Sequence, residues 1–532
     1  MSRPNRYRVT CVACAKRVEP GMGALVGDPP DAYCRACIPG RSRSASAVEW
    51  AMGKHGKAPF PYQRAGNRWL TMPHRLEGGG AILADEQGLG KTIQALMSVP
   101  LRSKLVVVCP RVAKTVWADH IRDYRPDIEV VKVCAGRTGR RAFGIPPKRH
   151  AAVTNFAILP AWLSRVWLVV EAGGNAADAV RKHAPHPGIL DEPIFVLVDE
   201  AHYAKSSTAA RSHRTGGLCA LARATGGASW LLTGTPLKNR PPDLYNLLKI
   251  AGLASVTWPS FRAFAEDMGG ERQTVARGRR AWVWTGAVRA HVPDVLRRVM
   301  LRREKRDVLT QLPPKTYETI TVPIPGAARE SADRALRALE GLGIDLASTT
   351  ASALLHAARG PAFDELSRAC RDLAVAKIPA SIDITDGHLA SGGLPPLVWS
   401  RHVDPVKAVG GRDGWMSIHG GTTGLQRDRA QQRFMAGDLR GLALSIKAAA
   451  TAITLTATDR AFFIDREWSP ADNEQAEDRI HRIGQHRPCL YTRIVAEHAL
   501  DRRLDELLTE KALTTSAAIS AARVVPTGGI GV

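Results

Sequence analysis

Apolar residues in this chain gather in short unbroken runs, and longer stretches with helical spacing separate them. A run without polar alternation is typical of a strand buried on both faces, as in parallel sheets. Such runs occupy residues 81–84, 105–109, 194–198 and 230–232, and after Gly392-Gly393 the strand pattern restarts at 394–399 and continues in alternating strand-like and turn-like pieces at 416–421, 441–445 and 461–465. Strands that alternate with helices predict an α/β fold, and the restart of the pattern predicts a second α/β lobe.

Three other stretches have a different character. Residues 327–376 are rich in Ala, Leu and Arg at helical spacing and predict a helical insertion. Residues 171–190 are rich in Gly, Ala and His and predict a loop, whereas 255–300 predicts helices and loops, with a hairpin in this stretch as the alternative.

The run at 81–84 leads into Asp-Glu-Gln-Gly-Leu-Gly-Lys-Thr at 85–92, and a helix-compatible stretch follows. A strand, a glycine-bearing turn and a helix N-terminus bring backbone N–H groups together at one anion. Gly88 and Gly90 let the backbone curl, although the general phosphate loop has a glycine where this chain has Asp85. Lys91 can reach the β- and γ-phosphates of a nucleotide, and the Thr92 hydroxyl can bind Mg²⁺. The segment predicts an ATP site.

The run at 194–198 ends in the paired carboxylates Asp199 and Glu200. Ligands of open α/β sheets bind at the carboxyl ends of the strands, where this pair is expected. Asp199 can hold Mg²⁺ through water, and Glu200 can polarise an attacking water. Upstream, Gln63 can pair with N6 and N7 of an adenine, or it can be an exposed residue at a helix start.

Two later segments are basic. Residues 475–485 predict a helix on which Arg479 and Arg482, three residues apart, lie on one face. These guanidinium groups can pair with nearby acids, or they can stabilise the charge that develops on a γ-phosphate. Residues 301–308 predict a basic helix whose face is solvated, contacts phosphate or bridges the lobes.

Four of the nine cysteines form two closely spaced pairs, Cys11/Cys14 and Cys34/Cys37, separated by a segment rich in Gly and Pro. Two such turns can direct four thiolates at one Zn²⁺, which would supply the stability that this small segment lacks. Disulfides or a redox pair are the alternatives. Four cysteine ligands leave no open position, so we expect structural zinc without catalysis.

The formal net charge is +24, from 74 basic and 50 acidic residues. This excess favours a polyanionic partner, and nucleic acid is the usual one, although a codon bias toward Arg can explain part of it. The chain has no apolar run of the roughly 18 residues that a membrane span needs, and its N-terminus has no apolar signal core. We therefore expect a cytoplasmic protein, or a nuclear one in a eukaryote.

Together these segments resemble the Swi/Snf-type ATPases of helicase superfamily two over residues 58–515, and most closely the compact annealing-helicase and phage or bacterial members. The matching segments are 85–92, Asp-Glu-Ala-His at 199–202, Leu-Thr-Gly-Thr-Pro-Leu-Lys-Asn at 232–239, Leu-Arg-Arg-Glu-Lys at 301–305 and Gln-Ala-Glu-Asp-Arg-Ile-His-Arg-Ile-Gly-Gln at 475–485. The resemblance implies two RecA-like P-loop lobes that close on ATP and Mg²⁺ and act on double-stranded or branched DNA. It implies catalytic roles for Lys91, Asp199, Glu200, Arg479 and Arg482, and ATP contacts by Gln63, Asp85, Gly88, Leu89, Gly90, Lys91, Thr92 and Asp199.

The expected domain order is a zinc module at 1–40, a basic linker at 41–57, a first RecA-like lobe at 58–320, a helical insertion with the second lobe at 321–515, and a flexible tail at 516–532. We expect a monomeric motor with no membrane contact. The chain departs from the family after Lys447, where Ala449, Ala450 and Ala452 replace glycines, and alanine does not enter positive φ freely.

Three functions fit these observations. The first is an ATP-driven translocase or remodeller of duplex DNA. The second is a DEAH-type helicase that separates strands of DNA or RNA, and the third is a zinc-bearing DNA-binding regulator with a weak ATPase. The presence of Lys91, Asp199, Glu200 and Arg482 counts against the third.

Overall fold

The protein is described here by a computed structural model. It describes residues 59–521 apart from 77, 137–141, 186, 237–240, 276–278, 285–286, 346–360 and 449–452, and before residue 59 it describes only the backbone of short strands. The chain divides into two compact units, Met1–Val308 with Ala518–Val532, and Leu309–Ala517, called unit 1 and unit 2 below. The short early strands are β1 (Arg3–Pro4), β2 (Val9–Thr10), β3 (Arg17–Val18), β4 (Gly23–Val26) and β5 (Asp31–Cys34).

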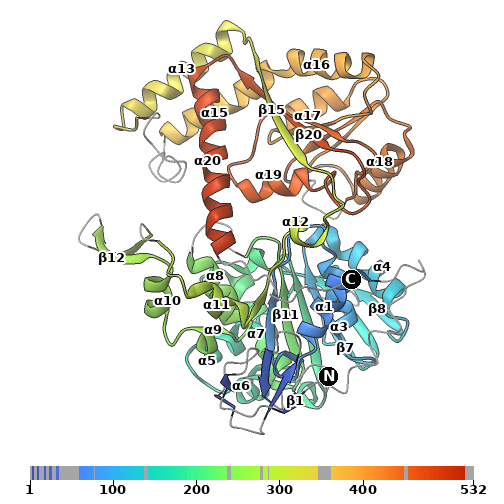
Figure 1. Ribbon diagram of the computed structural model, residues 1–532, viewed down its shortest axis with the longest axis vertical. Helices are drawn as coiled ribbons and strands as arrows, with labels where there is room; N and C mark the ends of the chain where they lie inside the picture. The colour runs from blue at the N-terminus through green and yellow to red at the C-terminus, as the bar shows by residue number, and fades with distance from the viewer. Residues whose placement is uncertain are drawn as a thin grey trace. The chain divides into compact units, whose positions relative to one another are not determined.

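A seven-stranded, fully parallel sheet forms the centre of unit 1, in the order β14-β6-β11-β10-β7-β9-β8 (Figure 1). Its strands are β6 (Gly80–Leu83), β7 (Lys104–Cys109), β8 (Val130–Val133), β9 (His150–Asn155), β10 (Ile194–Asp199), β11 (Ala228–Leu232) and β14 (Met300–Leu301). The central strands β6, β10 and β11 are buried along almost their whole length, as their unbroken apolar runs predict. Only the edge strand β8 alternates exposed and half-buried positions.

Helices cover both faces of this sheet. One face packs on α1 (Pro61–Leu70), α3 (Lys91–Ser98) and α4 (Lys114–Tyr124), around a core that includes Leu70, Leu96 and Trp117. The other face packs on α5 (Trp162–Glu171), α6 (Ala176–His183), α7 (Ala210–Ala224), α8 (Pro241–Ile250), α10 (Phe261–Asp267) and α11 (Val292–Arg297). Short helical turns complete the unit: α2 (Pro73–Leu76), η2 (Arg111–Ala113), η3 (Pro187–Leu190), η4 (Ala201–Ala204), α9 (Ala254–Thr257) and α12 (Lys305–Val308).

One expectation about unit 1 needs correction, and one alternative is decided. The segment 171–190 contains α6, because Asn175 caps the helix by accepting hydrogen bonds from the N–H groups of Ala177 and Asp178. The segment 255–300 contains an antiparallel hairpin, β12 (Gly270–Val275) and β13 (Arg279–Trp284), in addition to helices and loops.

Unit 2 contains a second fully parallel sheet, with six strands in the order β15-β20-β19-β16-β18-β17. The strands are β15 (Lys315–Val322), β16 (Leu397–Ser400), β17 (Trp415–Ile418), β18 (Gly441–Ser445), β19 (Arg460–Phe463) and β20 (Cys489–Ala496). The helices are α13 (Gly326–Glu340), α15 (Pro361–Ala376), α16 (Ile378–Ala390), α17 (Val403–Gly410), α18 (Gly424–Ala436), α19 (Pro470–Glu477) and α20 (Ala499–Ala521). The α/β class and the second lobe are therefore confirmed.

The predicted helical insertion is also present, because α13 and α15 pack against α20 around Leu339, Leu366 and Leu504. Among the residues that the structure describes, no helix combines the length and apolar character needed to cross a membrane.

Candidate functional site

The turn between β6 and α3 holds two glycines in the left-handed region. The backbone φ is +86° at Gly88 and +72° at Gly90, values that residues with a Cβ rarely adopt. A Cβ atom at Gly90 would lie 2.4 Å from Nε2 of Gln63, so the Gln63 side chain would have to shift to admit a larger residue. The Gln63 side chain accepts from the N–H of Phe60 at 3.0 Å and donates to the carbonyl of Leu89 at 3.4 Å. The structure thus brings Gln63 against the predicted phosphate loop.

Lys91 is the first residue of α3, and its ammonium group crosses back over the turn. Nζ donates to the backbone carbonyls of Asp85 at 2.8 Å and Glu86 at 3.2 Å. Burial lowers the pKa of Lys91, and the nearby charges of Glu200, Asp85 and Asp199 oppose that effect. These two hydrogen-bond partners are neutral carbonyls and do not neutralise the ammonium charge. That charge can therefore attract an anion at the helix N-terminus.

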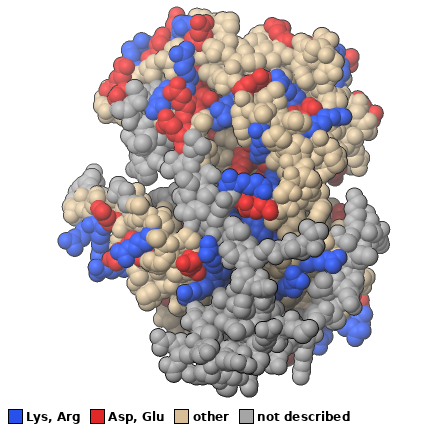
Figure 2. Space-filling view, viewed as in Figure 1, with Lys and Arg blue, Asp and Glu red and all other residues tan. Residues whose placement is uncertain are grey.

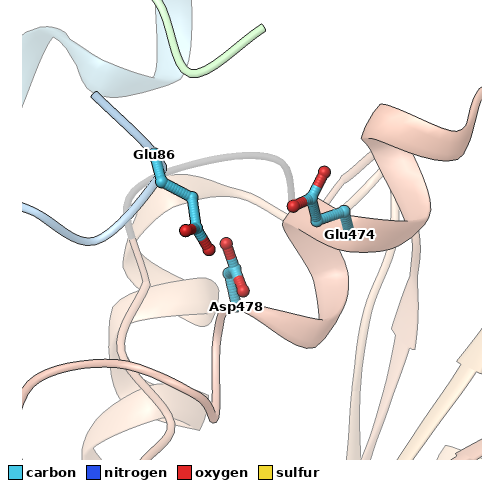
Figure 3. A group of neighbouring side chains, drawn as sticks. All are labelled: Glu86, Glu474 and Asp478. Atoms are coloured by element: carbon cyan, nitrogen blue, oxygen red, sulfur yellow. The ribbon is translucent and has the colours of Figure 1, made fainter. Parts of the chain in front are cut away.

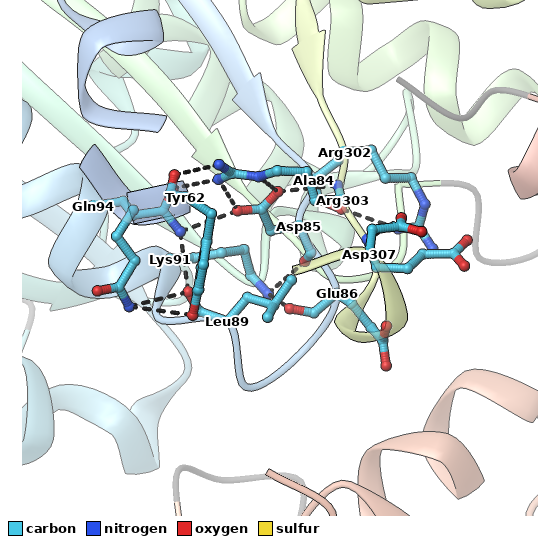
Figure 4. A network of polar contacts seen from close by, with 12 residues as sticks. Tyr62, Ala84, Asp85, Glu86, Leu89, Lys91, Gln94, Arg302, Arg303 and Asp307 are labelled. Carbon is cyan, nitrogen blue, oxygen red and sulfur yellow. Dashed lines mark hydrogen bonds and ion pairs between the residues drawn. The ribbon is translucent and has the colours of Figure 1, made fainter. Parts of the chain in front are cut away.

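The Asp85 side chain does not face the turn but forms a buried ion pair with Arg303 (Figure 4). Asp85 Oδ1 accepts from Nε of Arg303 at 3.0 Å and from its backbone N–H at 3.1 Å. Oδ2 accepts from Nη2 of Arg303 and, at 3.0 Å, from Nε2 of Gln94. Arg303 also donates to Gln94 Oε1 at 2.7 Å and to the carbonyl of Tyr62. Asp85 therefore connects the phosphate loop to residue 303, and its carboxylate is occupied by these donors.

The segment after β14 continues this connection along the loop. The N–H of Glu86 donates to the carbonyl of Arg303 at 2.9 Å, and the carboxylate of Glu86 accepts from the N–H of Lys305 at 2.7 Å. Arg302 donates from Nη1 to the carbonyls of Ala84 and Gly234, at 3.0 Å each. These bonds join the loop to the ends of β11 and β14.

The basic helix expected at 301–308 is therefore mostly wrong. Only Lys305–Val308 is helical, and Leu301 belongs to β14. The side chains of Arg302 and Arg303 are buried because loop carbonyls and Asp85 provide the partners that water would provide on a solvated face.

Asp199 and Glu200 lie at the carboxyl end of β10, at the sheet edge that also carries the phosphate loop. Asp199 Oδ2 accepts from Nε1 of Trp117 at 2.7 Å, and Oδ1 accepts from the N–H of Glu200 at 3.0 Å. Burial raises the pKa of Asp199 to about 6, with a further contribution from Glu200, while the Trp117 bond and Lys91 oppose the rise. A cation that approaches the Asp199 carboxyl would favour its ionised form and so promote loss of its proton.

Glu200 has a left-handed backbone, with φ +47°, where the chain turns from β10 into η4. Its Oε2 lies 3.2 Å from Nδ1 of His202, whose ring is buried against Tyr203. A left-handed glutamate at a strand end is a conformation that surrounding structure must enforce, and such residues gather at functional sites. Thr92, the second residue of α3, is partly exposed at the same helix terminus.

In unit 2, Arg479 and Arg482 meet at one backbone carbonyl. Nη1 of Arg479 donates to Ile453 O at 3.4 Å and Nη1 of Arg482 donates to it at 3.3 Å. Burial lowers the pKa of Arg482, and the charge of Asp478 opposes this. The shared carbonyl keeps the two guanidinium groups together.

The sequence predicted that these arginines lie on a helix that continues to residue 485. That prediction is wrong. α19 ends at Glu477, and the carbonyl of Arg479 accepts from the N–H of Leu455 at 2.9 Å instead of continuing a helical ladder. Gly484 has φ +98°, which closes the turn that follows. Figure 3 shows Glu474 and Asp478 one turn apart at this end of α19.

Other residues around α19 fix its end. Lys315, the first residue of β15, lies 2.9 Å from the Asp478 carboxylate and 3.2 Å from that of Glu477. Gln485 donates to the carbonyl of Thr458 at 2.7 Å. Lys447 is exposed and pairs with the buried Glu467 at 3.2 Å, whereas Ala449, Ala450 and Ala452 lie outside the described residues.

The side chains of Cys11, Cys14, Cys34 and Cys37 also lie outside the described residues. Two groups with clear contacts to the site were missed from the sequence. Trp117 lies on α4, which packs against one face of the sheet, and its indole N–H donates to Asp199. Gln94 lies inside α3, where nothing in the local pattern marks it as a partner of Asp85.

Comparison with known proteins decides the family. The model of the SNF2-related domain matches residues 62–348, more than half of the chain. The chain belongs to the SNF2-related family. A second model, the helicase conserved C-terminal domain, matches residues 413–484 in unit 2. In this SNF2-related chain the phosphate loop, the Asp199–Glu200 pair and the buried Arg303 all fall within the first match.

The relatives of this SNF2-related chain include the DNA annealing helicase and endonuclease ZRANB3 of Mus musculus, 27% identical over 90% of this chain and 42% of the relative. The SWI/SNF-related matrix-associated actin-dependent regulator of chromatin subfamily A-like protein 1 of Xenopus tropicalis is 27% identical over 85% of this chain and 44% of the relative. The chain thus spans about two fifths of these relatives' length. The Sulfolobus solfataricus SWI2/SNF2 ATPase core in complex with dsDNA is 19% identical, covering 87% of this chain and 93% of that chain at a TM-score of 0.37.

Proposed function

We propose that this protein is an ATP-driven motor that moves along or remodels double-stranded DNA. The observation that carries the proposal is the Lys91 ammonium, held over a two-glycine turn by two backbone carbonyls within the SNF2-related match. Family membership and the printed names of the relatives, which describe DNA annealing and chromatin regulation, support the same function. They favour it over a DEAH-type strand-separating helicase.

Each loop residue has a proposed part in ATP binding. Lys91 binds the β- and γ-phosphates, and the N–H groups from Gly88 to Gly90 and the α3 N-terminus bind the same anion. Gln63 reads the adenine edge. Asp85 and Leu89 act through their backbone and the contacts that shape the loop, since the Asp85 carboxylate is held by Arg303.

The residues at the sheet edge fit a Mg²⁺ ion. Thr92 and Asp199 would hold it, because a hydroxyl and a carboxylate are oxygen donors of the kind that Mg²⁺ prefers. When bound, Mg²⁺ neutralises charge on the phosphates. The raised pKa of Asp199, to about 6, still leaves its carboxylate ionised at pH 7.5. Glu200 orients the attacking water, and its enforced backbone conformation supports this role.

Arg479 and Arg482 are proposed as the arginines that stabilise charge on the γ-phosphate during hydrolysis. Their convergence on the Ile453 carbonyl supports a shared role, since a pair scattered over a solvated surface would have no common partner. The partner nucleic acid is proposed to be duplex or branched DNA, and the +24 formal charge fits a polyanion.

Four measurements on the full chain test the proposal. Phosphate release should rise on addition of duplex DNA more than on addition of single-stranded DNA or RNA. Lys91→Ala should abolish nucleotide binding and turnover, whereas Glu200→Gln should bind ATP and lose turnover. Displacement of a third strand from a triplex should exceed opening of a forked duplex. Wild-type turnover in Glu200→Gln would contradict the site, and fork opening without triplex displacement would favour the strand-separating helicase.

We also propose that the N-terminal segment 1–40 is a zinc module, joined by a linker at 41–57 to the first lobe. The two cysteine pairs support one Zn²⁺ with four thiolate ligands. Metal analysis of the full chain should find one zinc per molecule. A variant with Ser at Cys11 and Cys14 should lose it, and zinc retained in that variant would contradict the proposal.

A further inference from the structure

The hairpin β12–β13 is separate from both large sheets. Its two strands pair only with each other, with Gly270 opposite Trp284 and Val275 opposite Arg279. In Figure 1 it projects from unit 1 beyond α10. Glu271, Arg272, Gln273 and Thr274 are all exposed. A two-stranded ribbon alone is marginally stable in water, so something must hold it.

Aromatic packing on α10 provides that support. Trp282 meets Phe261 of α10 edge to face, with ring centroids 6.1 Å apart, and stacks on Trp284 at 6.4 Å. The backbone of Gly270 passes so close to the Trp284 ring that a Cβ atom there would contact it at 2.8 Å. The hairpin is therefore a fixed projection at its base.

One face of the hairpin collects its described cations. Arg272 lies opposite Trp282, and Thr274 lies opposite Arg280, so the alternation of a strand places all four on the face that also carries Trp284. The sequence 270–284 holds four arginines and one acidic residue, Glu271, whose place in the alternation is on the other face. Figure 2 shows basic side chains gathered at this flank of unit 1.

These arginines differ from their neighbours in having no acid to neutralise them. Within the described part of the chain, no carboxylate pairs with Arg272 or Arg280, although Glu271 is near in sequence and bonds Gln273 at 3.2 Å. By contrast, Arg262 on α10 pairs with Glu266 at 2.7 Å, Arg289 with Asp267 at 3.3 Å, and Arg297 with Asp294 at 2.9 Å.

We propose that Arg272 and Arg280, the two exposed arginines of this face, bind the sugar–phosphate backbone of DNA, as a contact additional to those of the motor's nucleotide-bearing core. The inference rests on the proposed function, which supplies DNA as the partner. Unneutralised arginines on a fixed support suit phosphate oxygens, which accept their hydrogen bonds and release counterions on binding. The contact reads no sequence, because backbone contacts position a protein without specifying bases.

The experiment uses the full chain and a labelled duplex of mixed sequence, with affinity measured by fluorescence anisotropy at several salt concentrations. The test variant carries Arg272→Ala and Arg280→Ala. Removing two phosphate contacts should make the negative slope of log K against log salt shallower by about 2. It should also weaken binding at 0.1 M salt on the order of tenfold or more. The variant with lysine at both positions should recover most of the affinity.

A matched control is Arg262→Ala, an exposed arginine on the supporting helix that already has an acid partner. It should bind DNA as the wild type does, and ATP hydrolysis without DNA should be the same in all variants. An unchanged salt slope in the double alanine variant would overturn the hairpin contact. If the wild type itself neither binds duplex nor shows stimulated hydrolysis, the proposed function fails first.

Discussion

Replacing Arg303 by methionine removes one side of the buried ion pair with Asp85 and keeps most of the side-chain volume. Asp85 is fully buried and Arg303 is 3% exposed, so water does not readily replace the lost guanidinium. The Asp85 carboxylate would keep the Gln94 donor at 3.0 Å and the backbone N–H at 3.1 Å, but it would lose the guanidinium that pairs with its charge. The phosphate loop would also lose its link to Tyr62.

The expected loss in the free energy of unfolding of unit 1 is about 3–5 kcal/mol at pH 7, as for other buried pairs broken on one side. Protonation sets an independent upper limit on this loss, because the buried carboxylate can take up a proton instead of staying charged. For an aspartate of ordinary acidity that proton uptake costs about 4 kcal/mol at pH 7. At pH 5 that cost falls to about 1.5 kcal/mol. In the variant the folded state binds this proton more tightly than the unfolded state, so the deficit should shrink as pH falls.

Hydrogen exchange of the amides of β6 and α3 measures this loss locally, which avoids treating a chain of two units as one transition. The variant carrying both Arg303→Met and Asp85→Asn has no buried charge and should recover about 2 kcal/mol or more at pH 7. Arg122→Met serves as the control, since Arg122 is 53% exposed in an ion pair with Asp119 and should cost well under 1 kcal/mol.

The reasoning would be refuted if Arg303→Met cost less than about 1 kcal/mol at pH 7, below the range for a one-sided buried pair. It would also fail if the deficit grew at pH 5, or if the variant with both substitutions were less stable than Arg303→Met alone.

Three further predictions concern nucleotide binding and turnover. Trp117→Phe removes the 2.7 Å hydrogen bond to Asp199 and should raise the pKa of that carboxyl further above about 6. A metal titration should then show Mg²⁺-supported hydrolysis weakened about tenfold, while ADP binding without metal is unchanged. Gly90→Ala should weaken ATP binding at least about tenfold, since φ is +72° there, whereas Gly144→Ala, which meets open space, should bind ATP normally in the same titration. Arg482→Ala should keep ATP affinity and lose on the order of 10³-fold in phosphate release, and a loss below tenfold would make this arginine structural only.

The strands that form the two sheet centres could be predicted because each is an unbroken apolar run. β10 and β18 coincide with their runs to within one residue, and the order of strand, turn and helix around Lys91 follows from the local residues alone. The parallel sheet then brings Asp199 to the same edge, which is a consequence of topology and not of any further signal.

The remaining features depend on contacts between residues far apart in the chain. The charge of Asp85 suggests a ligand-binding residue, but in the folded chain its carboxylate pairs with Arg303. The residues around Arg303 have helical spacing, so the sequence did not reveal that β14 ends just before it. The helix expected through Arg482 stops at Glu477, because Leu455 captures the carbonyl of Arg479. The hairpin has two Trp residues on one strand. Their packing against α10 became evident only from the contact between Trp282 and Phe261.

The pairing of Asp85 with Arg303 spans 218 positions of the chain. A ribosome that adds about 5–20 residues per second needs roughly 10 to 40 s to make the residues between them. Throughout that interval the newly made phosphate loop lacks both the Arg303 partner of Asp85 and the edge strand β14. We therefore expect the site to mature only after this last described strand of unit 1 is made, so that a nascent chain halted before Arg303 fails to retain ATP that a chain halted after α12 retains.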